Sequence, residues 1–235
     1  MLVSDFLPPP IPLSLTPSPS TTQEVYTKTI PDRFPVIEMH IKGKPDVLDL
    51  GCVDARPQRH SAIERIEHKP NLLFRRMVET NRDTLGIDID ADGVAVLNSL
   101  GYKAETADVE TMDLKKQFDT IVAGEIIEHL ENPGIFLRNM RRHLKPTGTL
   151  IVSTPNPFYQ GQVWKIWRYG TPSVHEDHTN WQDPTTLHAL LKRTGFEVTD
   201  GYWIQPPRSL LKTWKRLLRP YFAHGFLTLA RPSGG

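Results

Sequence analysis

Residue types suited to a nucleoside follow three short apolar runs of the chain. Gly51 ends the first run, 46–51, where a residue without a side chain lets backbone approach a ligand closely. Asp88 ends the second run, and its carboxylate could accept both hydroxyls of a ribose. Asp108 follows the third run and could accept from the exocyclic amine of an adenine. An acid after a strand commonly forms a turn or caps a helix, but three such ends in succession favour a nucleoside site over chance.

A second polar group, Glu125, Glu128 and His129, is spaced i, i+3 and i+4. At the start of a helix, this spacing puts all three residues on one face. They could hold a divalent ion such as Mg²⁺, with His175 or His178 completing the set. The ion would lower the pKa of a substrate hydroxyl bound to it. Alternatively, the two carboxylates only favour a helix N-terminus, and His129 is a pocket wall or a general base.

Aromatic residues gather in segment 154–181, where a lid or an acceptor pocket would lie. They could hold a ring or an apolar tail, or they could pack an inserted helix onto a sheet. His175 and His178 lie in the same segment, and a histidine there can take a proton from an acceptor hydroxyl. The candidate catalytic bases are therefore His129 and His178. The aromatic residues are Phe158, Tyr159, Trp164, Trp167, Tyr169 and Trp181.

The elements that must position these groups are short apolar runs that alternate with helical periods. This alternation predicts an α/β fold with a doubly wound sheet, in which ligands lie beyond the carboxyl ends of the strands. Strands are expected at 46–51, 84–88, 102–107, 118–123, 149–153, 196–203 and 226–230. Helices are expected over 63–78, 94–100, 135–144 and 184–195, with a helix stop at 145–148 and Asp183 as the N-cap of the last helix.

Composition places the chain among ordinary globular proteins. It has 235 residues and a formal net charge of +1, which argues against a wholesale nucleic-acid binder. The single cysteine, Cys52, cannot form an internal disulfide and is expected to be a small buried residue. Residues 1–24 hold six prolines among Ser and Thr, which predicts a disordered leader unlike a secretory signal. We expect a cytoplasmic protein; the composition does not indicate an oligomeric state.

The charge is concentrated near the C-terminus, where six basic residues and no acidic residue follow Asp200. Segment 207–219 has leucines and Trp214 on one helical face and bases on the other. A basic amphipathic helix of this kind either covers the sheet before the last strand or makes a peripheral contact with a membrane.

A dinucleotide-dependent oxidoreductase is a competing α/β interpretation. It is disfavoured because Val53 and Arg56 stand where the G-x-G-x-x-G pattern needs glycines after Gly51.

Residues from about 45 to 200 resemble the class I S-adenosylmethionine-dependent methyltransferases, in the branch of the ubiquinone-biosynthesis O-methyltransferases. The stretches that carry the resemblance are VLDLGC (47–52), LGIDID (85–90), ADVE (107–110), FDTIVAGEIIEHL (118–130), LRNMRRHLKPTGTLIVSTPNP (137–157) and EDHTNWQDPTTLHALLKRTGFEV (176–198). The resemblance implies a Rossmann-like sheet of seven strands with the last antiparallel, within a single methyltransferase domain over 25–235.

The resemblance also implies roles for individual residues. Asp49 and Gly51 would lie in the loop near the methionine moiety of the cofactor, with Cys52 behind it. Asp88 would hold the ribose hydroxyls, and Ile89 would also lie in the cofactor site. Asp108 and Val109 would border the adenine, and Glu125 would lie beside the methyl donor.

The expected activity is methyl transfer from S-adenosylmethionine to an oxygen of a small-molecule, lipid-linked or glycan-linked acceptor. One alternative is an RNA-terminus 2′-O-methyltransferase that uses a divalent metal through Glu125, Glu128 and His129, although the net negative charge of residues 1–200 disfavours nucleic acid. The other is a non-catalytic cofactor-binding protein, suggested by Val53 and Ala55 where the family has glycines.

Overall fold

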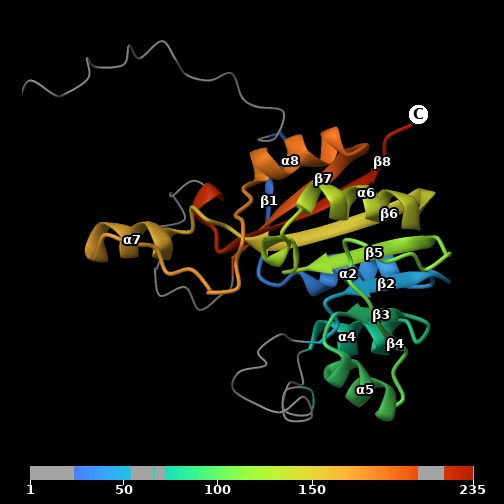
Figure 1. Cartoon of the computed structure of the whole chain (residues 1–235). Helices are drawn as coiled ribbons and strands as arrows, with labels where there is room; N and C mark the ends of the chain where they lie inside the picture. The colour runs from blue at the N-terminus through green and yellow to red at the C-terminus, as the bar shows by residue number, and fades with distance from the viewer. Residues whose placement is uncertain (1–23, 54–65, 67–71, 206–219, 235) are drawn as a thin grey trace, which may run out of the picture.

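The computed structural model describes residues 24–53, 66, 72–205 and 220–234 (Figure 1). The expected leader, apart from Glu24, and the expected amphipathic helix 207–219 lie outside the described residues.

The described residues form a three-layer α/β fold around a mixed sheet of eight strands, in the order β1-β7-β8-β6-β5-β2-β3-β4. All neighbouring strands are parallel except that β8 runs antiparallel to both β6 and β7. The strands are β1 (Lys28–Ile30), β2 (Val47–Leu50), β3 (Leu85–Asp88), β4 (Ala104–Thr106), β5 (Phe118–Gly124), β6 (Leu144–Pro155), β7 (Phe196–Ile204) and β8 (Gly225–Pro232). The predicted fold class and the antiparallel last strand are confirmed.

The predicted number of strands, seven, is wrong because β1 adds an eighth at one edge. This strand has three residues and no apolar alternation of its own. It is held by parallel pairing with β7 and by the preceding Tyr26, whose ring packs against Trp203 and Phe226 in the core. Such a strand depends on its neighbours and carries no local signal that sequence periodicity could detect.

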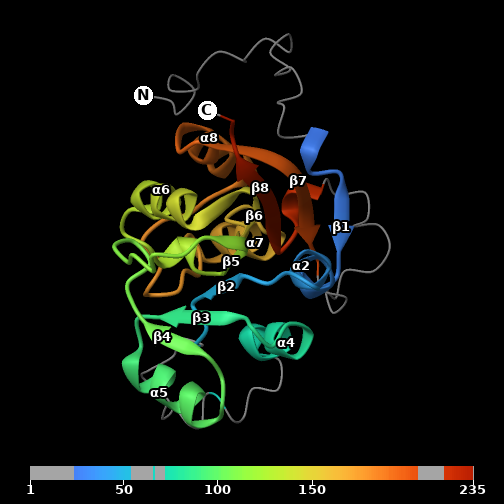
Figure 2. The ribbon, with the colours of Figure 1, turned by 90° about the vertical axis from the view of Figure 1, so that its right-hand side faces the viewer.

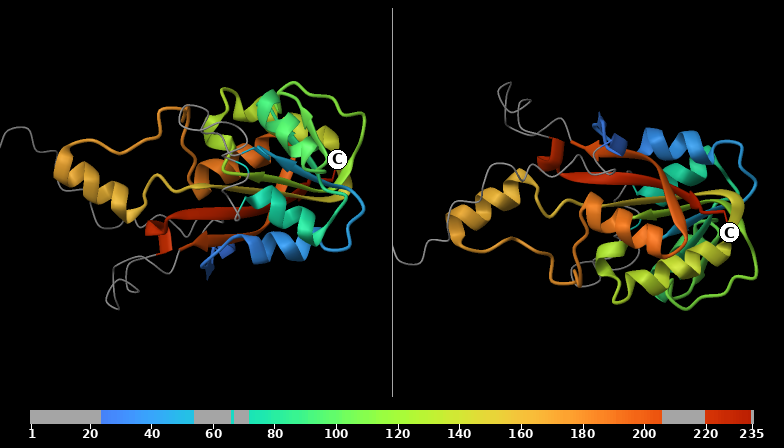
Figure 3. Two further views of the ribbon diagram at one scale, coloured as in Figure 1. Left: turned by 90° about the horizontal axis from the view of Figure 1, so that it is seen from below. Right: turned by 90° about the horizontal axis from the view of Figure 1, so that it is seen from above.

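Helices cover both faces of the sheet (Figures 2 and 3). On one face, α6 (Pro133–His143) and α8 (Pro184–Arg193) bury apolar residues in the larger core cluster. On the other, α2 (Phe34–Ile41) and α4 (Leu73–Thr80) pack against β2, β5, β6 and β8. Helix α5 (Ala91–Ser99) packs beside β3 and β4. Helix α7 (Gln160–Tyr169) projects beyond the sheet (Figure 1).

Several predicted boundaries need correction. The third predicted strand shortens to β4. Within the helix expected over 63–78, the described residues show Ile66 as helical and α4 beginning at Leu73. Helix α6 ends at His143, just before the predicted stop at 145–148, but those residues belong to β6, which begins at Leu144. Leu144 pairs with Phe118, and the register of β5 and β6 shifts between Phe118 and Thr120. By contrast, Asp183 caps α8 as expected and accepts from the N–H groups of Thr185 and Thr186.

Candidate cofactor and acceptor site

The carboxyl ends of β2 and β3 meet at the same edge of the sheet and bring together the first predicted residues. Gly51 has a φ of +76°, the left-handed region that favours glycine, and its N–H donates to the carbonyl of Ile87 at 2.8 Å. Asp49 is 1% exposed, and its Oδ1 makes no hydrogen bond among the described residues. Burial raises the pKa of Asp49 to about 8, with Arg33 opposing the shift and Asp88 adding to it.

Asp88 organises the turn between β3 and α5. Its Oδ2 accepts from the N–H of Val53 at 2.8 Å, and its Oδ1 accepts from the N–H of Asp90 at 3.0 Å. Burial raises the pKa of Asp88, although these backbone donors oppose the shift. The next side chain, Ile89, is 76% exposed, an unusual position for an apolar residue. A buried carboxylate beside an exposed apolar side chain suits a ribose joined to an aromatic base.

Cys52 and Val109 are buried behind this edge. Burial raises the pKa of the Cys52 thiol, and the side chain packs in an apolar cluster with Val53 and Phe74, as expected for a small structural residue. The carbonyl of Val109 accepts from Asn139 Nδ2 at 3.0 Å. Asp108 is exposed, and its Oδ1 accepts from the N–H of Glu110 at 2.9 Å. Asp108 therefore stabilises its own turn, which is a common role of an acid that follows a strand.

Glu125 follows β5 with a φ of +58°, a strained conformation for a residue other than glycine. Its Oε1 accepts from Arg33 Nη1 at 2.6 Å and from Ser153 Oγ at 3.2 Å. Arg33 Nη1 also donates to Ser153 Oγ at 2.9 Å. The side chain of Glu125 is thus engaged in an ion pair at the edge of the sheet.

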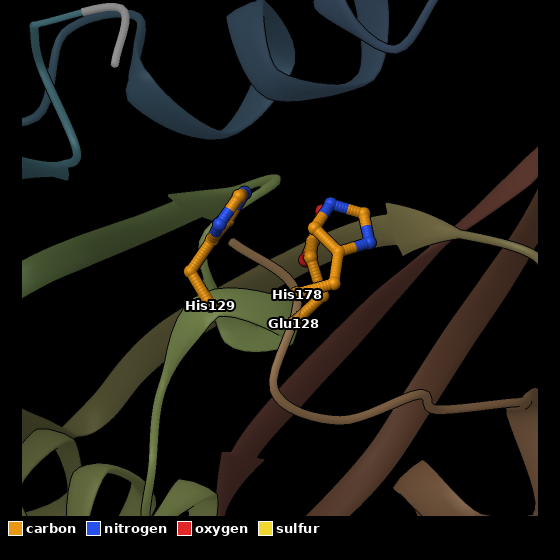
Figure 4. A group of neighbouring side chains, drawn as sticks. All are labelled: Glu128, His129 and His178. Atoms are coloured by element: carbon orange, nitrogen blue, oxygen red, sulfur yellow. The ribbon is translucent and has the colours of Figure 1, made fainter. Parts of the chain in front are cut away.

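Glu128, His129 and His178 form a compact cluster, with one potential ligand atom from each within 4.8 Å of the others (Figure 4). Glu128 and His129 belong to the 3₁₀ turn η2 (Ile127–His129), so the predicted helix start at Glu125 is wrong. The 3₁₀ turn brings Glu128 and His129 close to His178, whereas Glu125 pairs with Arg33 and is absent from the cluster.

Burial favours the neutral forms of Glu128 and His178. Glu128 is 2% exposed, and its Oε2 accepts from Thr154 Oγ1 at 2.9 Å. Burial raises the pKa of Glu128 to about 8, and the charge of Glu125 adds to the shift. Burial lowers the pKa of His178, and His129 and His175 add to that shift. His178 is therefore a neutral imidazole, able to accept a proton, at neutral pH.

The loop that carries His178 is tied to η2 by backbone and side-chain hydrogen bonds. The N–H of Thr179 donates to the carbonyl of Glu128 at 3.0 Å, and Asn180 Nδ2 donates to the carbonyl of Ile127 at 3.0 Å. These bonds hold His178 against His129, with ring centroids 4.7 Å apart. A small pocket follows, lined in part by His178, Trp181 and Gln162.

Arg33 is a candidate site residue that the sequence analysis missed. It lies just before α2 and reaches Glu125, a partner 92 positions away. No local pattern marks such a residue, because only the folded sheet brings its partners together.

Comparisons with known proteins identify the family and the fold. The family model of the methyltransferase domain matches residues 22–200. A ubiquinone biosynthesis O-methyltransferase of Rickettsia bellii (strain OSU 85-389) is 27% identical over 136 residues, which cover 55% of this chain and 57% of that protein. A protein of the same name from Rickettsia typhi (strain Wilmington) is 27% identical over 174 residues, covering 70% of this chain and 65% of that protein. The chain thus spans less than two thirds of the length of either relative.

The fold also matches a solved structure. A SAM-dependent methyltransferase from Archaeoglobus fulgidus superimposes with a TM-score of 0.57 at 18% identity, covering 85% of this chain and 91% of that chain. This similarity shows a shared fold.

Proposed function

This chain belongs to the methyltransferase domain family and has the fold of S-adenosylmethionine-dependent methyltransferases; we propose that it transfers a methyl group from S-adenosylmethionine to an oxygen of a small-molecule or lipid-linked acceptor. The observation that carries the proposal is the pair of buried carboxylates in β2 and at the end of β3. Asp49 has an oxygen with no hydrogen-bond partner among the described residues, and Asp88 is fixed by two backbone donors. The relatives named as O-methyltransferases support oxygen as the acceptor atom.

The residues present fit the cofactor. The unpartnered Oδ1 of Asp49 can accept from the ammonium of the methionine moiety, and Asp88 retains lone pairs for ribose hydroxyls. The exposed side chain of Ile89 offers an apolar surface for the adenine. Arg33, at the same edge, offers a cation for the methionine carboxylate. When bound, S-adenosylmethionine supplies a methyl group on a sulfonium, which the acceptor oxygen takes by in-line displacement.

The chain's own contribution to the reaction is to position the acceptor and remove its proton. His178 lies beside the small pocket and is neutral at neutral pH, so its ring can accept the proton of an acceptor hydroxyl. His129, in contact with His178, is the alternative base.

A divalent cation held by Glu128, His129 and His178 is a second candidate for activating the acceptor, supported by their mutual distance. Two imidazoles and one carboxylate suit Zn²⁺ or Fe²⁺ better than the expected Mg²⁺, which prefers oxygen ligands. RNA is not favoured as the acceptor, because the relatives are named for the biosynthesis of a small molecule.

The roles of Asp88 and His178 can be separated by experiment. We expect Asp88→Ala to weaken binding of S-adenosylhomocysteine roughly 10- to 100-fold in calorimetric titration, because a buried charged hydrogen-bond acceptor is lost. His178→Ala should leave this affinity unchanged and lower turnover on a panel of phenols with and without an apolar tail. Asp92→Ala, which removes an exposed acid of α5, is the matched control.

Two results would contradict this division of roles. Equal loss of affinity in both variants would show that His178 serves cofactor binding. No binding of S-adenosylmethionine or S-adenosylhomocysteine by the folded wild-type chain would reject the proposed function and favour a non-catalytic role. The proposed cation site is tested by calorimetric titration of wild-type and Glu128→Gln protein with Zn²⁺ and then with Mg²⁺. We expect Zn²⁺ to bind the wild-type protein more tightly than Mg²⁺ does, and Glu128→Gln to weaken that binding.

A further inference from the structure

We propose that the α7 face, defined as Trp164, Lys165, Trp167, Arg168 and Tyr169, is a contact surface for a bilayer that contains anionic phospholipid. This inference concerns where the protein docks, and it does not depend on which molecule is methylated.

The α7 face is exposed to a degree that an apolar helix face rarely is. Trp167 is 78% exposed, Tyr169 64% and Trp164 54%, and α7 has no buried residue. Of the two alternatives for the aromatic segment, packing of an inserted helix onto the sheet is therefore contradicted for Trp164, Trp167 and Tyr169. Figures 1 and 3 show α7 extending away from the sheet, at the edge where β6 ends. A contiguous exposed apolar surface of this kind indicates an interaction site.

The residue types on this face select a lipid surface as the partner. Tryptophan and tyrosine, with apolar rings and a polar tip, favour the boundary between headgroups and acyl chains. Lys165 and Arg168 interleave with them, and there is no acidic residue between Glu131 and Glu176. A helix with aromatic anchors and bases, free of acids, matches a negatively charged headgroup layer.

The geometry favours lying on a bilayer over crossing one. Helix α7 has ten residues, and no helix in the described part of the chain combines the length and apolar character needed to traverse a membrane. An interfacial helix needs neither, because it inserts only its apolar side chains.

The α7 face is also coupled to the pocket beside His178. Gln162, in the first turn of α7, accepts from the N–H of Ser173 at 3.1 Å. Gln162 and Ser173 both line that pocket, together with His178 and Trp181. A bilayer that contacts α7 would therefore lie next to the pocket, which would allow an acceptor with an apolar tail to enter from the lipid phase.

Binding to vesicles tests the inference. The full chain is sedimented with vesicles of phosphatidylcholine alone or with about one third phosphatidylglycerol, and the bound fraction is measured against lipid concentration. We expect binding to the anionic vesicles, weakened about tenfold or more in W164S/W167S because two apolar anchors are lost. The control M39S/I135S changes two exposed apolar residues on other helices and should bind as wild type does.

Charge is tested separately. K165E/R168E should weaken binding by roughly fivefold or more for each residue, whereas K192E/R193E, the same change on the exposed end of α8, should not. Circular dichroism and thermal unfolding of every variant establish that it is folded. The vesicle assay contains neither methyl donor nor acceptor. Its result therefore remains valid even if a separate methylation assay detects no activity.

Three outcomes would overturn the inference. One is unchanged binding in W164S/W167S with loss in K212E/K215E/R216E, which would assign the contact to the C-terminal segment instead. Another is failure of the wild-type chain to bind either kind of vesicle. The third is self-association of the wild-type chain in sedimentation velocity that W164S/W167S abolishes without vesicle binding, which would assign the α7 face to a second copy of the chain.

Discussion

The guanidinium of Arg33 acts on three carboxylates that the sheet brings to one edge. It donates to Glu125 at 2.6 Å, and its charge opposes the burial that raises the pKa values of Asp49 and Glu128. Because Asp49 and Glu128 are nearly inaccessible to water, their charged forms are costly unless a cation is near. A cationic ligand such as a sulfonium with an ammonium group would favour the same charged forms.

Asp49 makes the stability of the ligand-free protein depend on pH. Its pKa is about 4 in an unfolded chain and about 8 in the folded one. The folded protein therefore holds an extra proton between these values, and the free energy of unfolding falls as the pH rises from about 4 to about 8. Asp49→Asn lacks this titrating group, so its free energy of unfolding should not show this fall. Relative to wild type, its free energy of unfolding should rise by up to about 1.4 kcal/mol per pH unit.

Urea unfolding between pH 5 and pH 8.5, without ligand, measures this difference. Asp92→Asn, which removes an exposed acid of α5, is the control for loss of one charge. If the pH profile of Asp49→Asn runs parallel to that of wild type, Asp49 ionises normally in the folded protein.

Elements with strong local signals were predicted from the sequence, and those with long-range causes were not. The apolar runs that form β2, β3 and β5 and the capping signal of α8 act within a few residues. The same runs placed Asp49 and Asp88 at one edge before the fold was known. The position of Arg33 and the 3₁₀ turn at Glu128 depend on partners dozens of residues away, so spacing alone misassigned or missed them.

The N-terminus of α8 is the element whose contribution to stability is easiest to isolate. Asp183 Oδ1 accepts from the N–H groups of Thr185 and Thr186 and from the hydroxyl of Tyr221. Asp183→Ala should lower the free energy of unfolding by about 1–2 kcal/mol, because the cap is lost. Asp183→Asn keeps an acceptor of similar shape and should cost much less. Equal losses in both variants, measured by urea unfolding, would show that charge and not capping stabilises this end.

At the scale of the whole molecule, the segment around β1 joins the two ends of the described chain. Trp203 Nε1 donates to the carbonyl of Tyr26 at 3.0 Å, and the Tyr26 hydroxyl bonds with Thr228 Oγ1. Tyr26 is only 4% exposed, so its ring is part of the main core. The same segment continues into Arg33 and thereby connects the core to the candidate site.

Tyr26→Ala should therefore destabilise the whole molecule, not only its edge. We expect a loss of about 3–5 kcal/mol in the free energy of unfolding, typical of removing a large buried ring, and about 1 kcal/mol for Tyr26→Phe, which removes only the hydroxyl. Chemical denaturation followed by both fluorescence and circular dichroism measures these values. A loss below about 1 kcal/mol in Tyr26→Ala would mean that β1 and its flanking residues are dispensable.

The strand order also determines which strand contacts can form while the chain is being synthesised. Strand β8 lies between β6 and β7, and β1 pairs with β7, so Lys28 finds its partner Tyr202 only after most of the chain has been made. Contacts so distant along the chain form slowly and late. Until β7 has emerged, β1, which leads into the segment of Arg33, lacks the strand with which it pairs, although Glu125 and Ser153, the partners of Arg33, have already been made. We therefore expect nascent chains that stop before β7 to lack cofactor affinity, even though Asp49 and Asp88 have already emerged.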